Sequence, residues 1–151
     1  MNKDSKVIKS SNYRWNAVPE KRYKDEPDSH EGVRRFTLLG DGKEEPLNFQ
    51  TRYFEVEPGG YTSFEQHQHP HSVVVIRGSG SVILDDELQD IAPHDVVYVA
   101  PGTMHQFHAD QGEPLGFLCI VDRKRDKPVL PGDREVDEVI QTEEVRGKVR
   151  R

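Results

Sequence analysis

Four side chains that could bind a metal ion alternate along one short segment of the sequence. Glu65, His67, His69 and His71 occupy every second position there, and the segment holds three of the seven histidines. Alternate side chains of an extended strand share one face, so we expect these four to point the same way unless the chain bends at Pro70. Imidazole and carboxylate groups suit a divalent first-row transition metal. The spacing therefore favours a metal site over an accidental cluster of solvated histidines.

The residues around this segment predict the β-strands that would position it. Apolar and polar residues alternate from Phe49 to Glu57, and Pro58-Gly59-Gly60 is typical of the turn that would end this strand. Tyr61 to His67 is then predicted as the next strand, and Gly78-Ser79-Gly80 as a hairpin turn. Further strand signals occupy residues 33–40, 73–76, 81–84, 88–91, 96–99 and 115–121. Short strands at such close intervals, with no helical period between them, predict an all-β sandwich or barrel.

Polar extensions flank the predicted strands. Residues 1–31 lack clear periodicity, and Trp15 could anchor this N-terminal arm on the domain or on a partner subunit. Residues 126–151 form a charged C-terminal tail. Three apolar residues recur at helical spacing after Gly132, which leaves a short packed helix and a loose tail as alternatives. The chain is therefore divided into the arm, a β-domain of residues 32–125, and the tail.

Composition limits the class of protein further. The chain has 151 residues, of which 33% are hydrophobic and 32% charged, so we expect one domain with a modest core. No apolar run approaches the roughly 18 residues of a membrane span, and no signal-peptide core follows the N-terminus. The single cysteine, Cys119, excludes an intramolecular disulfide and is expected to be a buried structural thiol. We therefore predict a cytoplasmic protein with no membrane partner.

The negative charge is concentrated in the middle of the chain. Between Phe49 and Val121 there are ten acidic and two basic residues, whereas the net charge of the whole chain is −6. An acidic centre repels phosphate backbones, so we expect no nucleic-acid partner.

Two segments resemble the conserved motifs of the cupin superfamily. Asp95 to His105 is similar to the second motif, with Pro101 and His105 at its proline and histidine positions. The 20 residues from Gly59 to Gly78 equal the length of the shorter form of the first motif. The chain therefore resembles a small single-domain cupin, which implies a double-stranded β-helix, or jelly-roll barrel, with polar extensions at both ends.

The resemblance implies a set of metal ligands in either of two registers. The preferred register keeps both flanking glycines and implies the ligands Glu65, His67, His71 and His105, with His69 facing inward beside them or replacing Glu65. The rival register uses His67, His69 and His105, and places Val73 at the glutamate position. Both registers share His67 and His105. The implied cofactor is a divalent transition metal: iron, manganese, nickel or zinc.

Family resemblance leaves several functions open. The leading expectation is a small metal-dependent enzyme with an oxygenase-type, dioxygenase-like reaction on a small organic molecule. The alternatives are a non-catalytic module that binds a small ligand, and a metal-dependent isomerase or epimerase of a sugar or keto-acid. No catalytic residue is assigned. Cupins of this size also resemble proteins that form homodimers through their sheets, so a homodimer is expected.

One arginine of the predicted barrel could recognise an anion. Arg77 shares the face of His71 in the predicted strand and could bind a carboxylate or phosphate near the mouth of the barrel. The alternative is a salt bridge between Arg77 and an acid such as Asp85.

Overall fold

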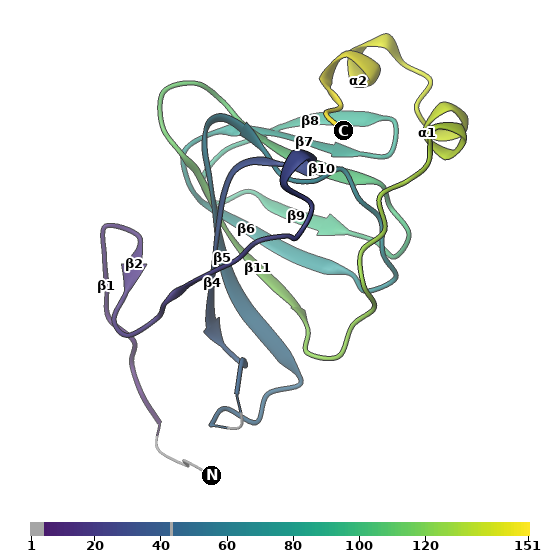
Figure 1. The fold of residues 1–151 in the computed structure, drawn as a ribbon. Helices are drawn as coiled ribbons and strands as arrows, with labels where there is room; N and C mark the ends of the chain where they lie inside the picture. The colour runs from purple at the N-terminus through teal and green to yellow at the C-terminus, as the bar shows by residue number, and fades with distance from the viewer. Residues whose placement is uncertain (1–4, 43) are drawn as a thin grey trace.

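The computed structural model describes residues 5–42 and 44–151, and most of its elements are β-strands (Figure 1). The first four residues of the predicted arm lie outside the described part. In chain order the strands are β1 (Ser10–Ser11), β2 (Arg14–Trp15), β3 (Glu20–Lys21), β4 (Glu31–Leu39), β5 (Phe49–Tyr61), β6 (His71–Arg77), β7 (Gly80–Leu84), β8 (Glu87–Ile91), β9 (Val96–Val99), β10 (His105–Ala109) and β11 (Leu115–Asp122). The helices are the 3-10 helix η1 (Pro27–Ser29), α1 (Asp133–Val139) and α2 (Glu143–Lys148).

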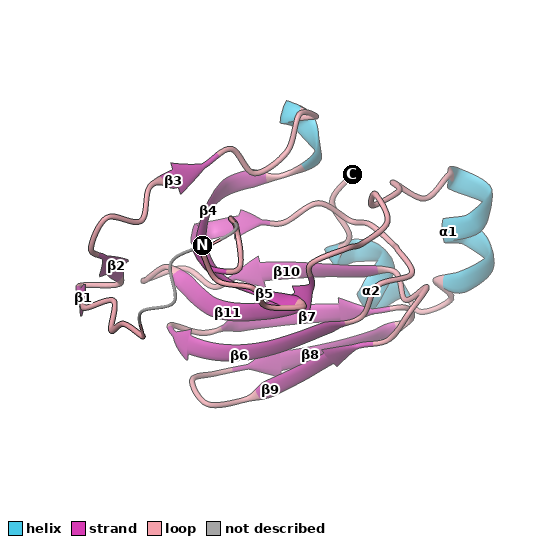
Figure 2. Ribbon diagram, turned by 90° about the horizontal axis from the view of Figure 1, so that it is seen from below, coloured by secondary structure: helices cyan, strands magenta, loops and turns pink. Residues whose placement is uncertain are grey.

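One curled antiparallel sheet makes up the body of the fold (Figure 2). Its strands follow the order β8-β7-β10-β5-β11-β6-β9, while β4 pairs with β5 and β3 pairs with β4. Strands that are distant in the sequence thus lie side by side, as in a jelly roll. The all-β jelly-roll fold expected from the sequence is confirmed.

Two groups of buried side chains fill the fold. The larger group lies inside the barrel and includes Phe54, Phe107 and Phe117. The ring of Phe117 stacks on the rings of both Phe54 and Phe107. The smaller group lies under the C-terminal helices, where Ile140 and Val145 pack with Phe64, Ile83 and Met104.

The C-terminal segment is a pair of short packed helices and not a loose tail. Figure 1 shows α1 and α2 beside each other at one end of the molecule, with the C-terminus next to them. Asp86, in the turn between β7 and β8, accepts hydrogen bonds from the backbone N–H groups of Gln141 and Thr142, each at 2.9 Å. Thr142 in turn caps the first turn of α2. No helix in the described part of the chain has the length and apolar character needed to cross a bilayer.

The predicted turn at Pro58-Gly59-Gly60 does not end a strand. Strand β5 continues through it to Tyr61, and the pairing with β4 shifts between Val33–Val56 and Glu31–Tyr61. The glycine-rich segment is therefore an irregularity within a long strand, of the kind that bends one strand against its partner. The prediction of a turn was wrong because a bulge and a turn attract the same residues.

The predicted strand from Tyr61 to His67 is a loop after Tyr61, which is the last residue of β5. The only pairings of this loop in the described structure are isolated bridges from Glu65 to His105 and from Gln66 to Val129. The His-rich segment thus lies in the connection from β5 to β6, and His71 is the first residue of β6.

The predicted hairpin at Gly78-Ser79-Gly80 is a crossover. Strand β6 pairs with β9 and β11, whereas β7 pairs with β8 and β10, so the turn carries the chain from one side of the barrel to the other. Gly78 has a φ of +67°, and a Cβ there would overlap the carbonyl oxygen of Pro114. Only glycine meets both conditions without strain.

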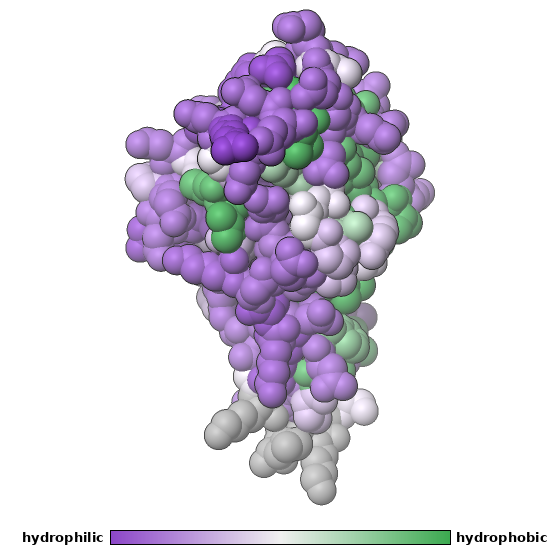
Figure 3. All heavy atoms as spheres, turned by 90° about the vertical axis from the view of Figure 1, so that its right-hand side faces the viewer, coloured by the Kyte–Doolittle hydropathy of each residue, from purple (hydrophilic) through white to green (hydrophobic). Residues whose placement is uncertain are grey.

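The N-terminal segment packs on the barrel of its own chain. Trp15 lies 5.0 Å from Tyr53 between ring centroids, and Arg14 donates two hydrogen bonds to Glu55. Tyr23 reaches the edge of the barrel core, where its ring meets Phe54 edge-on. Figure 3 shows a face that is mostly hydrophilic, with hydrophobic residues in smaller separate groups.

Candidate metal centre

Five buried side chains converge where the β5–β6 loop meets the start of β10. Glu65, His67 and His69 come from the loop, His71 opens β6, and His105 opens β10. All five are between 3% and 8% exposed. Backbone hydrogen bonds join Glu65 and His105 in both directions, at 2.9 and 3.2 Å, so the loop is fixed against β10. The structure thus brings together every candidate ligand identified in the sequence.

Three of the four imidazoles each have a buried nitrogen that no described residue contacts through a hydrogen bond. The buried Nε2 atoms of His67, His71 and His105 have no hydrogen-bond partner among the described residues. His67 donates from Nδ1 to the carbonyl oxygen of His69 at 2.7 Å, and His105 does the same to Thr103 at 2.8 Å. A carbonyl acceptor on Nδ1 orients a histidine so that the lone pair of Nε2 faces a metal ion.

Three of the histidines, His67, His71 and His105, are held in the neutral form that binds metal. Burial lowers the pKa of His67 to about 4 and also lowers the pKa values of His71 and His105. Mutual repulsion between these imidazoles adds to the lowering at His67 and His71. Metal ligation requires deprotonated imidazole, so the site needs no proton release from these histidines at neutral pH.

Glu65 is fixed as a carboxylate facing two of these histidines. Burial opposes its ionisation, but Lys24, His105 and Ser63 outweigh burial and lower the pKa of Glu65. Its Oε2 accepts a hydrogen bond from the Ser63 hydroxyl at 2.9 Å and lies 3.1 Å from the Lys24 ammonium. Its Oε1 lies 3.9 Å from Nε2 of both His67 and His105.

These separations match a shared ion. Two ligand atoms about 2.1 Å from one metal lie about 3.0 Å apart at right angles and about 4.2 Å apart when opposite, and 3.9 Å falls within this span. Potential ligand atoms lie within 4.8 Å of one another in two sets: His67, His69 and His71, and Glu65, His67 and His105. His67 belongs to both sets, so each set could hold a metal ion and the two sets are joined at His67.

His69 is supported by a carboxylate that the sequence gave no reason to choose. Its Nδ1 donates to Oδ1 of Asp126 at 2.8 Å, which leaves Nε2 on the site side, and its ring stacks 3.7 Å from that of His67. Asp126 also accepts from the backbone N–H groups of Gln68 and His69. These bonds lower the pKa of Asp126 well below its usual range, and the hydrogen bond from the Gln68 N–H has the largest effect. A histidine held by a carboxylate in this way is typical of a ligand.

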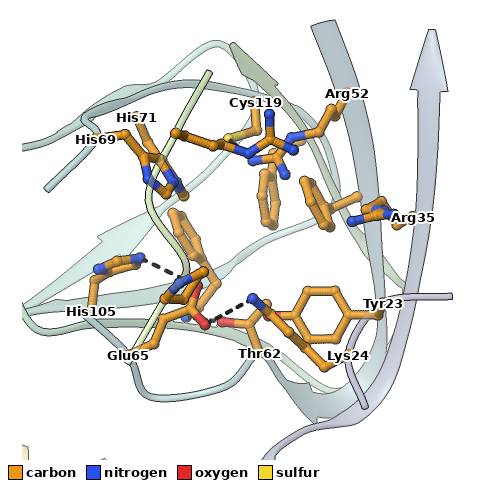
Figure 4. A pocket seen from close by; sticks show the side chains of 15 residues that line it. Tyr23, Lys24, Arg35, Arg52, Thr62, Glu65, His69, His71, His105 and Cys119 are labelled. Atoms are coloured by element: carbon orange, nitrogen blue, oxygen red, sulfur yellow. Dashed lines mark hydrogen bonds and ion pairs between the residues drawn. The ribbon is translucent and has the colours of Figure 1, made fainter. Parts of the chain in front are cut away.

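A cavity of about 140 Å³ opens beside the ligands. This is many times the roughly 10–15 Å³ that one water molecule needs, so the site is not a closed structural one. Figure 4 shows His69, His71 and His105 on one side of the cavity and Arg35 and Arg52 on the opposite side. The stacked aromatic rings of the barrel core form an apolar wall between the histidines and the arginines.

The far side of the cavity is cationic and was not identified from the sequence. Arg35 comes from β4, Arg52 from β5 and Arg125 from the segment after β11. Arg52 donates to the thiol sulfur of Cys119 at 3.4 Å. Cys119 is buried as expected, and burial raises its pKa, so the thiol stays protonated.

Arg77, the arginine that the sequence offered for anion binding, does not line this cavity. It forms an ion pair with Glu55 at 3.1 Å, while Tyr13 stacks on its guanidinium. The salt-bridge alternative therefore holds, with Glu55 as the partner in place of Asp85.

The inward position of Arg52 could have been recognised from the sequence, because Arg52 alternates with Phe54 and Val56 along the inward face of β5.

Comparison with known proteins places this geometry in a family. A model of the cupin domain family matches residues 52–121. The 1-methylthio-D-xylulose 5-phosphate methylsulfurylase of Rhodospirillum rubrum is 38% identical over 128 residues, which cover 83% of this chain and 80% of the relative.

Two solved structures agree with this assignment. A cupin-2 domain protein from Rhodospirillum rubrum is 38% identical, with a TM-score of 0.77 and 87% of each chain covered. A cupin 2 conserved barrel domain protein from Rhodopseudomonas palustris is 34% identical, with a TM-score of 0.85, and the match covers 97% of this chain and 100% of that one.

Proposed function

This chain belongs to the cupin domain family, and we propose that it is a small metal-dependent enzyme that acts on a methylthio sugar phosphate or a close analogue. The observation that carries the proposal is the convergence, beside an open cavity, of one carboxylate oxygen and three Nε2 atoms that have no hydrogen-bond partner among the described residues. The name of the curated relative supports the substrate class. Glu65, His67, His71 and His105 are the proposed ligands, and His69, supported by Asp126, is the proposed fifth.

The proposed chemistry takes place at the edge of the cavity. When bound, a divalent ion supplies a Lewis acid that polarises a carbonyl or hydroxyl oxygen of the substrate. The chain keeps Glu65 ionised and in place, because Tyr23 donates to Ser63 and the Ser63 hydroxyl donates to Oε2 of Glu65. Burial raises the pKa of Tyr23, so this hydroxyl keeps its proton. The Lys24 ammonium nitrogen lies 3.1 Å from the same oxygen and is a second proton donor to it.

An oxygen-dependent reaction is the second candidate. The sequence led us to expect a dioxygenase-like enzyme, and an imidazole-rich centre with one carboxylate also suits iron. We place it second because the curated relative is named for a methylsulfurylase. An isomerase or epimerase would use the same centre without oxygen, and a binding module would hold ligand without turnover.

Metal analysis combined with a turnover assay tests the proposal. We expect tag-free protein to contain about one transition metal per chain, His105→Ala to lose it, and the exposed-loop variant His94→Ala to retain it. Incubation with 1-methylthio-D-xylulose 5-phosphate and a small thiol, which would accept the methylsulfur group as a mixed disulfide, should then consume the substrate equally with and without air. Consumption of dissolved oxygen would favour the second candidate. Metal-free protein after reconstitution, or bound substrate without turnover, would leave a binding module.

A further inference from the structure

The cationic side of the cavity lacks a counter-charge. Among the described residues, Arg35, Arg52 and Arg125 form no ion pair with a carboxylate: Arg52 donates to a thiol, and Arg125 donates to backbone carbonyl groups. Among the described residues that line the cavity, Glu65 is the one carboxylate, and it is already paired with Lys24. The arginines therefore face the cavity with positive charge that nothing in the described chain neutralises.

Arg52 is unusual because it is buried without full satisfaction. It is 7% exposed, and its Nε has no hydrogen-bond partner among the described residues; the Nε of Arg35 is also buried and unpartnered. A buried charge normally costs several kcal/mol unless it is paired and hydrogen-bonded. Unsatisfied guanidinium donors at the wall of a cavity point to a ligand that would satisfy them.

The strand register brings the side chains of Arg35 and Arg52 close to each other on one face of the sheet. Arg52 lies directly opposite Cys119 on β11 and opposite Thr37 on β4, and Arg35 is two residues from Thr37 on the same face. Diagonal neighbours in a sheet have Cβ atoms about 7–8 Å apart, within reach of two long side chains that bind one group. Arg125 approaches from the segment that follows β11.

The three guanidinium groups are close enough to repel one another. Burial lowers the pKa of Arg35, and the charge of Arg52 lowers it further. Burial also lowers the pKa of Arg125, followed by the charges of Arg52 and Arg35. An anion placed between them would remove this repulsion.

We propose that Arg35, Arg52 and Arg125 form a binding site for the phosphoryl group of a small phosphomonoester. This inference rests on the proposed function, since the histidine side of the same cavity would hold the reacting end of the substrate. A phosphomonoester carries a charge of about −1.5 to −2 and three acceptor oxygens. Guanidinium groups on three separate elements match three oxygens, whereas a planar carboxylate is satisfied by one guanidinium fork.

Binding of inorganic phosphate and glycerol 3-phosphate to the metal-loaded protein tests the proposal. Isothermal titration at constant ionic strength should detect both anions and no binding of glycerol. Arg35→Gln and Arg52→Gln should each weaken phosphate binding about tenfold to a hundredfold, as expected for the loss of a charge-assisted hydrogen bond. Arg34→Gln is the matched control, because Arg34 lies on the opposite face of β4 and pairs with Glu20. It should bind as the wild type does.

Thermal denaturation gives a second readout. Phosphate should raise the melting temperature of the wild type and of Arg34→Gln, and raise that of Arg35→Gln by clearly less at the same phosphate concentration. Without phosphate, Arg35→Gln should be at least as stable as the wild type, because an unpaired, partly buried charge has been removed. If Arg52→Gln fails to fold, Arg35→Gln decides the outcome.

The two proposals fail in different ways. Phosphate binding that is lost in His105→Ala but unchanged in both arginine variants would mean that the anion binds at the metal, and would overturn this inference. A weak ligand has a dissociation constant of about 0.1 mM, so binding should be detectable well below 10 mM phosphate. Absence of any phosphate binding at 10 mM would also overturn the inference. Arginine-dependent binding in a protein that holds no metal would support the anion site and refute the metal-dependent enzyme.

Discussion

At the scale of single residues, the site depends on which nitrogen of each histidine is already occupied. His67, His69 and His105 each use Nδ1 for an internal hydrogen bond, so Nε2 is the atom available to bind a metal ion. Their backbone and carboxylate acceptors are therefore part of the centre. Removing an acceptor should loosen metal binding without removing a ligand.

Asp126 offers the sharpest test of this idea. We expect Asp126→Asn to weaken metal affinity by about tenfold to a hundredfold, because His69 loses a charged acceptor. Competition with a chelator of known affinity measures the effect, with Asp122→Asn as an exposed control. Equal metal retention in Asp126→Asn and the wild type would show that His69 is not a ligand.

A buried histidine outside the centre should make stability depend on pH. His108 is 6% exposed, and burial, followed by Lys148 and Arg150, lowers its pKa from 6.5 to about 4. The unfolded chain binds this proton more tightly, so the contribution of His108 is fully present above about pH 6.5 and is lost as the pH falls toward 4. The total should be on the order of 2–3 kcal/mol.

Urea denaturation of the wild type and His108→Gln between pH 7.5 and 4.5 measures this contribution. The free energy of unfolding should fall more steeply in the wild type than in the variant. Parallel pH profiles would contradict the assignment to His108.

The sequence predicted the histidines but not the residues that support them. Alternation of Glu65, His67, His69 and His71 identified the candidate ligands, although the segment that leads to His71 is a loop and not a strand. Asp126 is 57 residues from His69 and lies in a charged segment with no pattern of its own, so no local signal could select it. Arg52 had a signal, since a charged residue at an inward position of an amphipathic strand requires an explanation.

At the scale of elements, the C-terminal helices complete the second buried cluster. Ile140 and Val145 are 0% and 1% exposed, and they belong to the same buried cluster as Ile83 and Phe64. Apolar spacing after Gly132 predicted the helices, but packing depends on the side chains of β7 and the β5–β6 loop, which a helical period cannot identify.

Shortening Ile140 should therefore destabilise the whole fold. We expect Ile140→Ala to reduce the free energy of unfolding by about 2–5 kcal/mol, because it creates a cavity at a fully buried position. Glu138→Ala, on the exposed face of α1, should change it by no more than about 0.5 kcal/mol. Chemical denaturation compares the three proteins. A small loss at Ile140 would mean that the helices detach from the barrel without cost.

At the scale of the whole molecule, both ends of the chain contribute to one cavity. Tyr23 and Lys24 approach from the predicted N-terminal arm, and Arg125 and Pro128 approach from the segment that follows β11. The boundaries drawn at residues 31 and 125 from the sequence separate segments that share this site. Of the two basic residues in the acidic centre of the chain, Arg52 lines the cavity and Arg77 anchors the arm through Glu55.

Deletion of residues 1–30 should lower both the melting temperature and the metal content. The deletion removes the Arg14–Glu55 ion pair, the Trp15–Tyr53 contact and the Lys24–Glu65 contact. Trp15→Ala should lower the melting temperature alone, and Val7→Ala, at a side chain that is 79% exposed, should change neither. An unchanged melting temperature after the deletion would mean that the arm is idle.

The homodimer implied by family resemblance stays a prediction. Strand β9 ends the sheet order, and its Val96 and Tyr98 are 69% and 65% exposed. Light scattering of the purified protein distinguishes one chain from two.

The strand order also constrains how the protein can be made. Strand β5 pairs with β11 over its whole first half, from Phe49–Asp122 to Val56–Leu115. This pairing cannot form until residues about sixty to seventy positions later in the chain have been synthesised. A ribosome extends a chain by about 5–20 residues per second, so β5 spends several seconds with one edge unpaired. During this interval it is the part of the nascent chain most exposed to mispairing with another strand. Translation speed through residues 62–122 should therefore affect the yield of folded protein more than translation speed after them.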